Sequence, residues 1–164
     1  MSKQADKGPQ PTAKLSQQSR RVAELRCEVL GERLTAARLA AYAELMANDH
    51  ALSAYDLIAL LEKRQGRKIA PLTVYRHLDF LTRVGLVHRI ESTQSYLPCD
   101  QPEDTHESQY LLCTACGRVD ELQEKKLGFL LGKVANQHGF QPAKAIVEVS
   151  GLCGDCVATA PNPA

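Results

Sequence analysis

Four of the six cysteines in this chain form two Cys-x2-Cys pairs, Cys113/Cys116 and Cys153/Cys156, separated by 36 residues. Four thiolates arranged in two such pairs match the closed tetrahedral ligand sphere of structural zinc. The separation is longer than in a simple zinc ribbon, so the metal would join the two edges of a whole αβ unit. Disulfides and an iron–sulfur cluster are the alternatives, and the paired spacing in a reducing cytosol favours zinc over both.

The segment from residue 16 to residue 85 has the start and stop signals of four helices. Ser16, Thr35 and Ser53 are the expected N-caps, and Pro71 suits the first turn of the fourth helix. Apolar spacing predicts the following buried faces: Val22, Leu25, Val29 and Leu30; Leu39, Tyr42, Leu45 and Met46; Leu57, Ile58, Leu60 and Leu61; Val74, Leu78, Leu81 and Val84. The last two helices, joined by a short segment, suggest a helix-turn-helix.

Residues 86–97 alternate around a polar turn at 92–94, which predicts a β-hairpin and hence a wing. Further on, 109–112, 118–122 and 144–150 are predicted strands, and 123–138 is a predicted helix ended by Gly139. The expected fold class is therefore α+β: a winged helix-turn-helix domain followed by a small αβ domain with a four-cysteine zinc site. The predicted divisions are a disordered tail 1–15, a winged helix 16–98, a hinge 99–107, the αβ domain 108–157 and a frayed end 158–164.

Charge is unevenly distributed along the chain. Residues 1–98 contain 15 Lys and Arg against 10 Asp and Glu, whereas residues 99–164 contain 5 against 9. The positive first half favours a polyanionic partner, although surface charge mostly serves solvation. No apolar run is long enough to span a membrane and the polar start lacks a signal peptide, so the expected location is the cytoplasm, with no membrane partner.

A second group of metal-binding side chains is His88, Cys99, His106 and Glu121, which come from the wing, the hinge and the first strands of the αβ domain. Each has an ordinary interpretation when taken alone: an exposed histidine, a packed thiol or a solvated side chain. Together, they would allow one ion to tie both domains to each other. A thiolate, two imidazoles and a carboxylate suit zinc better than a hard oxygen-seeking metal.

The predicted fourth helix begins with Thr73, Tyr75 and Arg76, at the end that a recognition helix presents to the major groove. Arg76 could bind guanine through two hydrogen bonds, and the ring of Tyr75 could pack on a thymine methyl group. The alternative is an ordinary surface Tyr and Arg. The expected phosphate contacts, which position the protein without specifying sequence, are Arg33, Arg38, Arg67 and Lys68.

Several segments closely resemble the ferric uptake regulator family, and in particular its zinc-sensing members. They are Arg33-Leu34-Thr35-x-x-Arg38, Ser53-Ala54-Tyr55-Asp56-Leu57, Thr73-Val74-Tyr75-Arg76-x-Leu78-Asp79-Phe80-Leu81, Gly85-Leu86-Val87-His88-Arg89-Ile90-Glu91-Ser92 and Gly151-Leu152-Cys153-x-x-Cys156. The resemblance extends over residues 16–157. The Pro that often follows the Thr of the first motif is Ala36 here, which leaves the start of the second helix uncertain.

This resemblance implies a homodimeric, metal-dependent bacterial repressor whose αβ domain is the dimerisation domain. It implies two zinc ions per protomer: a structural one on Cys113, Cys116, Cys153 and Cys156, and a regulatory one on His88, Cys99, His106 and Glu121. It also implies that Tyr75 and Arg76 contact bases of a palindromic operator. When zinc is scarce, the repressor would leave this operator and zinc-uptake genes would be expressed. Histidine-rich runs are absent from the second domain, so no third metal site is expected.

Three other functions are consistent with parts of the sequence. An iron, manganese or peroxide sensor of the same family is disfavoured by Cys99. A zinc hydrolase or deaminase using Glu107 or Glu121 as a general base is disfavoured. The sequence contains neither the His-Glu-x-x-His motif nor a His-x-Glu followed by Pro-Cys-x-x-Cys. We therefore expect that the protein is not an enzyme and has no small organic substrate. A redox switch through Cys27 or Cys99 would need an exposed thiol of low pKa. Cys27, within a predicted helix, is instead expected to be a small buried apolar side chain.

Overall fold

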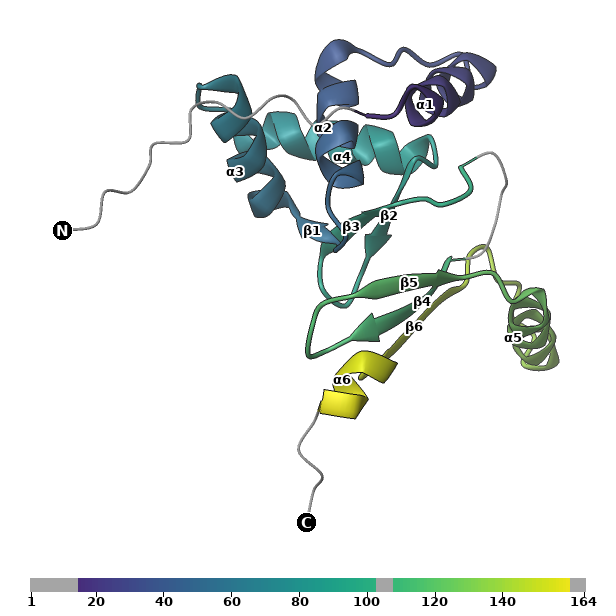
Figure 1. Ribbon diagram of the computed structural model, residues 1–164. Coiled ribbons are helices and arrows are strands. Elements are labelled where there is room, and N and C mark those ends of the chain that lie inside the picture. Colours follow the sequence, from purple (N-terminus) through teal and green to yellow (C-terminus); the bar gives the residue numbers. More distant parts are fainter. Residues whose placement is uncertain (1–14, 103–107, 160–164) are drawn as a thin grey trace.

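A computed structural model of the chain describes residues 15–102 and 108–159 (Figure 1). The predicted tail, apart from its last residue, and much of the predicted hinge, including His106 and Glu107, lie outside the described residues. Within the described ranges no helix is long and apolar enough to cross a membrane.

The N-terminal unit contains the four expected helices: α1 (Gln17–Val29), α2 (Ala36–Met46), α3 (Ala54–Gln65) and α4 (Pro71–Arg83). Their starts follow the local chemistry of the sequence. The side chains of Ser16, Thr35 and Ser53 each accept a hydrogen bond from a backbone N–H three residues on, and Pro71 occupies the first turn of α4. The uncertainty at Ala36 is thereby resolved, because α2 begins at this residue under the Thr35 cap.

A three-stranded antiparallel sheet completes this unit, in the order β1 (Leu52–Ser53), β3 (Ser95–Pro98), β2 (Val87–Ile90). The predicted hairpin is confirmed as β2 and β3, with His88 opposite Leu97. The short β1 is not anticipated by the sequence. It extends the hairpin and leads directly into α3, which fixes the wing against the helices.

The main core lies among α2, α3 and α4. The predicted buried residues of α4, Val74, Leu78, Leu81 and Val84, are all fully buried, which confirms that face. Burying four such side chains contributes on the order of 6–12 kcal/mol before the entropy of ordering is subtracted.

The predicted buried face of α1 is wrong. This helix packs through the small side chains of Ala23 and Cys27, which are almost completely buried, whereas Leu25, Val29 and Leu30 are exposed. Small side chains let the helix axis approach the core closely, and the Arg26 guanidinium Nε donates to the carbonyl of Val84 at 2.9 Å, at the end of α4. The interpretation of Cys27 as a small buried residue is confirmed.

The C-terminal unit has three strands in the order β5 (Val119–Leu122), β4 (Ser108–Cys113), β6 (Ile146–Gly151), together with α5 (Lys125–Gln137) and α6 (Gly154–Thr159). β4 is antiparallel to β5 and parallel to β6. The sequence predicts a frayed end from residue 158, but α6 continues to Thr159. The sheet lies beneath the wing, and α5 stands at one end of it (Figure 1).

A second, small apolar cluster lies where the two units meet. Ile90 of β2 packs with Tyr110 and Leu112 of β4, and Leu97 and Val119 lie against them. The face of the C-terminal sheet that carries Tyr110 and Leu112 is therefore turned towards the wing. Polar contacts surround this small shared cluster, among them those of Glu121 with His88 and of Glu148 with the turn after β2.

Candidate metal centres and nucleic-acid interface

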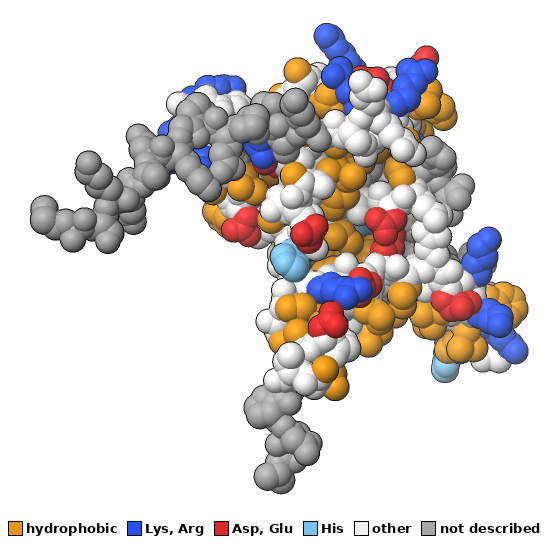
Figure 2. Space-filling view, in the orientation of Figure 1, with side chains coloured by type: hydrophobic (Ala, Val, Ile, Leu, Met, Phe, Trp, Pro, Cys, Tyr) orange, Lys and Arg blue, Asp and Glu red, His pale blue; other side chains and the backbone are white. Residues whose placement is uncertain are grey.

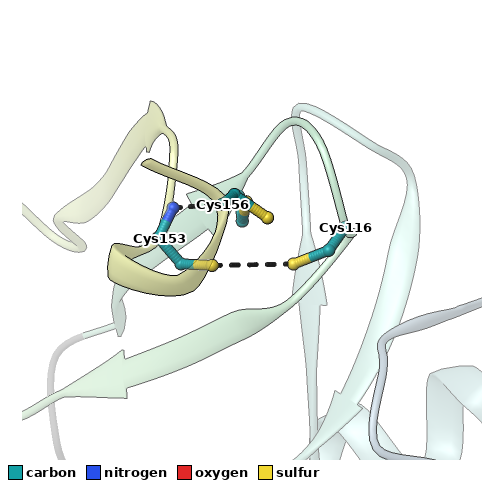
Figure 3. Close-up of side chains that lie close together, drawn as sticks. Cys116, Cys153 and Cys156 are labelled. Atoms are coloured by element: carbon teal, nitrogen blue, oxygen red, sulfur yellow. Dashed lines mark hydrogen bonds between the residues drawn. The ribbon is translucent and has the colours of Figure 1, made fainter. Parts of the chain in front are cut away.

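The first cysteine cluster is assembled at one end of the C-terminal sheet. Cys113 is the last residue of β4, Cys116 lies in the turn to β5, and Cys153 and Cys156 lie at the start of α6, after β6 (Figure 3). Because β4 and β6 run parallel, with Cys113 opposite Gly151, the segments that follow these strands emerge side by side. The four sulfur atoms all lie within 4.8 Å of one another.

The protonation of these thiols fits a site for a divalent cation. Hydrogen bonds from the backbone N–H groups of Cys153 and Cys116 lower the pKa of Cys113 to about 6. Hydrogen bonds to the sulfurs of Cys153, Cys116 and Cys113 raise the pKa of Cys156 to about 12, because they hold its proton. Four thiolates this close need a positive charge among them, and a tetrahedral zinc ion suits this donor set. The Sγ atoms of Cys116 and Cys153 are 3.8 Å apart, far beyond a disulfide bond.

The second cluster joins the two units. The ligand atoms of His88 on β2, Cys99 just after β3 and Glu121 on β5 lie within 4.8 Å of one another. The His88 Nε2 is 3.0 Å from Oε1 of Glu121, whose other oxygen accepts from the backbone N–H of Asp100 at 3.3 Å. Three of the four predicted residues are thus brought together, and the fourth, His106, lies outside the described residues.

Burial raises the pKa of both cysteines that a redox switch would use. Burial, and then the Glu121 carboxylate, raise the pKa of Cys99 to about 12. Burial also raises the pKa of Cys27. A redox sensor needs an exposed thiolate of low pKa, so neither cysteine has the required environment.

The residues expected to contact bases lie in the first half of α4. Thr73 and Arg76 are exposed and Tyr75 is half-buried, with its ring against the core of the winged helix. A positioned Tyr beside a free guanidinium at the start of a recognition helix is suited to the major groove.

The expected phosphate contacts have different environments. Arg33 and Arg67 are exposed, and Lys68 pairs with Glu62 at 2.8 Å. Arg38 is more constrained, because its guanidinium lies 3.6 Å above the Phe80 ring and also donates to the carbonyl of Arg33 with a 2.5 Å hydrogen bond. These contacts hold Arg38 in one position near the helix-turn-helix, at the junction of α2 and α4.

Two residues near the joint are not among those that the sequence predicts to be functional. Tyr110, fully buried, places its ring 5.8 Å from the imidazole of His88. Glu148 of β6 accepts hydrogen bonds from the backbone of the wing turn. Both depend on strand register: the hairpin pairing could have placed Tyr110 opposite Glu121, but no local signal sets the parallel pairing of β6.

Comparison with known proteins identifies relatives over most of the chain. The model of the ferric uptake regulator family matches residues 30–150. The zinc uptake regulation protein of Escherichia coli is 40% identical over 138 residues, covering 82% of this chain and 79% of that protein. The zinc uptake regulation protein of Mycobacterium tuberculosis is 32% identical over 129 residues, covering 77% of this chain and 95% of that protein.

Solved structures give the same result. A zinc uptake regulator in complex with zinc and DNA superposes with a TM-score of 0.82 at 37% identity, covering 88% of this chain and 97% of that one. The holo form of XcZur superposes with a TM-score of 0.77 at 34% identity, covering 85% and 96%. On its sequence and its structure alike, this chain belongs to the ferric uptake regulator family.

Proposed function

We propose that this chain is a zinc-responsive transcriptional repressor, and not an enzyme, that binds operator DNA when zinc is present. The observation that carries the proposal is the convergence of His88, Cys99 and Glu121 from two units, one of which is a winged helix. A metal bound there would fix the DNA-binding unit against the C-terminal unit. The relatives named as zinc uptake regulators, one of them solved with zinc and DNA, support the same function.

The donor atoms of this site favour zinc as the regulatory metal. A buried thiol, an imidazole and a carboxylate together form a set of soft and borderline ligands. Zinc favours such ligands more strongly than iron(II) or manganese(II) does. We assign His106 as the fourth ligand, in the segment between Cys99 and β4. A complete set of four protein ligands leaves no open position for a reactive water, so the site suits sensing and not hydrolysis.

The four-cysteine site is assigned to a second, structural zinc ion. Its ligands come from the end of β4, from the turn that follows it and from the segment around the start of α6. Hydrogen bonds such as that from the Thr114 N–H to the Gly151 carbonyl, at 2.8 Å, bring these segments side by side. Zinc bonds there replace packing that a unit of this size lacks.

We infer that the protein acts as a homodimer through its C-terminal unit. Hydrophobic side chains are exposed along α5, where lysines lie between them (Figure 2). Phe129 is 75% exposed and Leu130 55%, and Val149 on the outer face of the sheet is 52% exposed. So much apolar surface on one unit is typical of an interface between subunits. A two-fold dimer would present two winged helices to a palindromic site, with recognition helices roughly 34 Å apart.

In this arrangement, residues of the winged helix make all the proposed contacts with DNA. Thr73, Tyr75 and Arg76 enter the major groove, with Arg76 donating to a guanine and Tyr75 packing on a thymine methyl group. Arg33, Arg38, Arg67 and Lys68 contact phosphates, and the stacking of Arg38 on Phe80 orients its guanidinium. When zinc is scarce the joint loses its metal, the winged helices change spacing, and zinc-uptake genes are expressed.

The proposal is tested by measuring metal content per protomer, followed by binding to a candidate operator while free zinc, iron and manganese are each buffered. We expect two zinc ions: one resistant to chelators, and one whose removal abolishes DNA binding. DNA binding restored by iron or manganese and not by zinc would contradict the zinc assignment while leaving the family membership intact.

A further inference from the structure

Glu148 forms a direct contact between the C-terminal sheet and the wing. Its Oε1 accepts a hydrogen bond from the backbone N–H of Glu91 at 2.7 Å, and its Oε2 accepts one from the backbone N–H of Ser92 at 3.0 Å. These two N–H groups lie in the turn that follows β2. One carboxylate therefore holds two consecutive amides of the other unit, a contact with strict geometry.

The position of Glu148 in the sheet places it in the same row as a proposed zinc ligand. Tyr110 of β4 is opposite Glu121 on β5 and opposite Glu148 on β6. Directly paired residues of adjacent strands project from the same face of a sheet. Glu121, Tyr110 and Glu148 thus form one row across the sheet that faces the wing, with the two carboxylates on either side of the tyrosine.

Each carboxylate of this row contacts β2 or the turn that follows it. Glu121 lies 3.0 Å from Nε2 of His88 in β2, and Glu148 holds the amides of Glu91 and Ser92 just beyond the strand. Glu121 and the apolar cluster around Ile90 already join the units at β2. The hydrogen bonds of Glu148 add an attachment beyond the end of this strand, which restricts rotation of the wing about the first contact.

We propose that Glu148 is a positioning residue for zinc-dependent DNA binding: it fastens the wing turn to the C-terminal sheet and so favours the orientation in which the regulatory ligands meet. The inference depends on the proposed function, because it assigns Glu148 a part in the response of that same site. Any contact that favours the zinc-competent orientation raises the affinity for zinc, and zinc in turn favours the contact. Glu148 therefore increases both zinc affinity and operator affinity without binding either.

The test compares Glu148→Ala and Glu148→Gln with the wild-type protein in zinc titrations and operator binding. Losing the charge-assisted hydrogen bonds should weaken operator binding at sub-saturating zinc, and zinc binding at the regulatory site, by roughly tenfold in the Ala variant. The Gln variant, which retains one acceptor oxygen, should lie between the Ala variant and wild type. Tight zinc at the four-cysteine site and the oligomeric state should remain unchanged.

Glu28→Gln is the matched control, since Glu28 is an exposed carboxylate on α1 that is not among the residues of the joint named above. Removing a negative charge alone strengthens binding to DNA. The control should therefore bind DNA as well as the wild type or better, whereas the Glu148 variants should bind more weakly. The sign of the effect separates positioning from general electrostatics.

A direct readout is the amide resonances of Glu91 and Ser92 in NMR spectra of the full chain. These resonances should shift in Glu148→Gln if the carboxylate holds them in solution. Unchanged amide resonances, or zinc and operator affinities equal to those of the wild type, would overturn the inference. If the wild type itself showed no zinc-dependent DNA binding while the amide shifts were present, the proposed function would fail and the contact alone would stand.

Discussion

Cys99 and Cys113 are both buried cysteines, yet the pKa values of their thiols are shifted in opposite directions. The pKa of Cys113 is lowered to about 6, first by the backbone N–H of Cys153. The pKa of Cys99 is raised to about 12 by burial and by the carboxylate of Glu121. Backbone N–H groups thus favour the thiolate of Cys113, whereas burial and the nearby carboxylate favour the protonated thiol of Cys99, which must give up its proton to bind a metal. Cys156 of the four-cysteine cluster, with its pKa raised to about 12, must likewise lose a proton when zinc binds there.

Zinc binding at the regulatory site should depend on pH through Cys99. The metal binds the thiolate, and because the pKa of about 12 lies above the assay range, zinc uptake must release this proton. Above the range in which histidines titrate, each unit by which the pH is lowered should weaken zinc binding by about tenfold on account of this thiol. Competition with a chelator at several pH values measures this change in zinc affinity. An affinity that does not change with pH would exclude Cys99 as a ligand.

Arg76→Ala should weaken binding to the operator by about 1 to 3 kcal/mol and binding to random DNA very little, because a base contact carries sequence information. Binding assays on both DNAs at one salt concentration test this. Arg67→Ala is the control, and should weaken binding to both DNAs and lower the salt dependence. Equal losses on the two DNAs for Arg76→Ala would identify Arg76 as a phosphate contact.

At the scale of elements, packing decides which face of a helix is buried, and the spacing of apolar residues predicts this face only in part. α4 buries the face that its spacing predicts, but α1 buries Ala23 and Cys27 and leaves Leu25 exposed. In the C-terminal unit, α6 is a short helix that begins between Cys153 and Cys156, two of the four clustered cysteines. Such an element has little apolar surface of its own, and the proposed zinc site substitutes for a core.

Cys113→Ser should remove the tightly held zinc and unfold or dissociate the C-terminal unit. Structural zinc contributes about 10 to 16 kcal/mol in small zinc-binding peptides, as much as the whole stability of an ordinary domain. Zinc content, thermal melting and sedimentation measure the effect. Cys27→Ser, the same change at a buried cysteine outside the cluster, should retain the zinc. A Cys113→Ser protein that kept its melting temperature and its mass in solution would contradict the structural role.

At the scale of the whole molecule, a small apolar cluster and a few polar contacts determine how the two units are oriented. Ile90, Tyr110 and Leu112 form the buried part of the joint, with His88 and Glu121 beside them. A ligand that converts a mostly open population into a mostly closed one must favour the closed form by about 5.5 kcal/mol. Metal bonds across the joint can supply that amount, and the small shared core permits the change.

Leu130→Asp should dissociate the dimer, because a carboxylate would then be buried in an apolar interface without a partner. Leu130 lies on α5 and is 55% exposed in the single chain, so we expect it to lie in the proposed interface. Sedimentation at several protein concentrations gives the mass. Val29→Asp, at an exposed apolar position on α1, is the control and should stay dimeric. A dimeric Leu130→Asp protein would place the interface elsewhere.

Local signals in the sequence were sufficient for the starts of the first four helices and for the hairpin of the wing. Capping by Ser16, Thr35 and Ser53 acts within one helical turn, and the prediction of these helix starts is confirmed. The spacing of the Cys-x2-Cys pairs likewise anticipated a cluster that the structure brings together. The face of α1 could not be predicted in this way, because it depends on how closely two helices approach.

The sequence by itself determined where the first four helices begin, that a wing follows α4, and that four cysteines form one cluster. Each depends on residues close together in the chain or on a chemical spacing. Only the tertiary structure decided that β6 runs parallel to β4 and that Glu121, Tyr110 and Glu148 share one row beneath the wing. The physical reason is that strand register and the contact between units arise from packing over long separations, which no local pattern encodes.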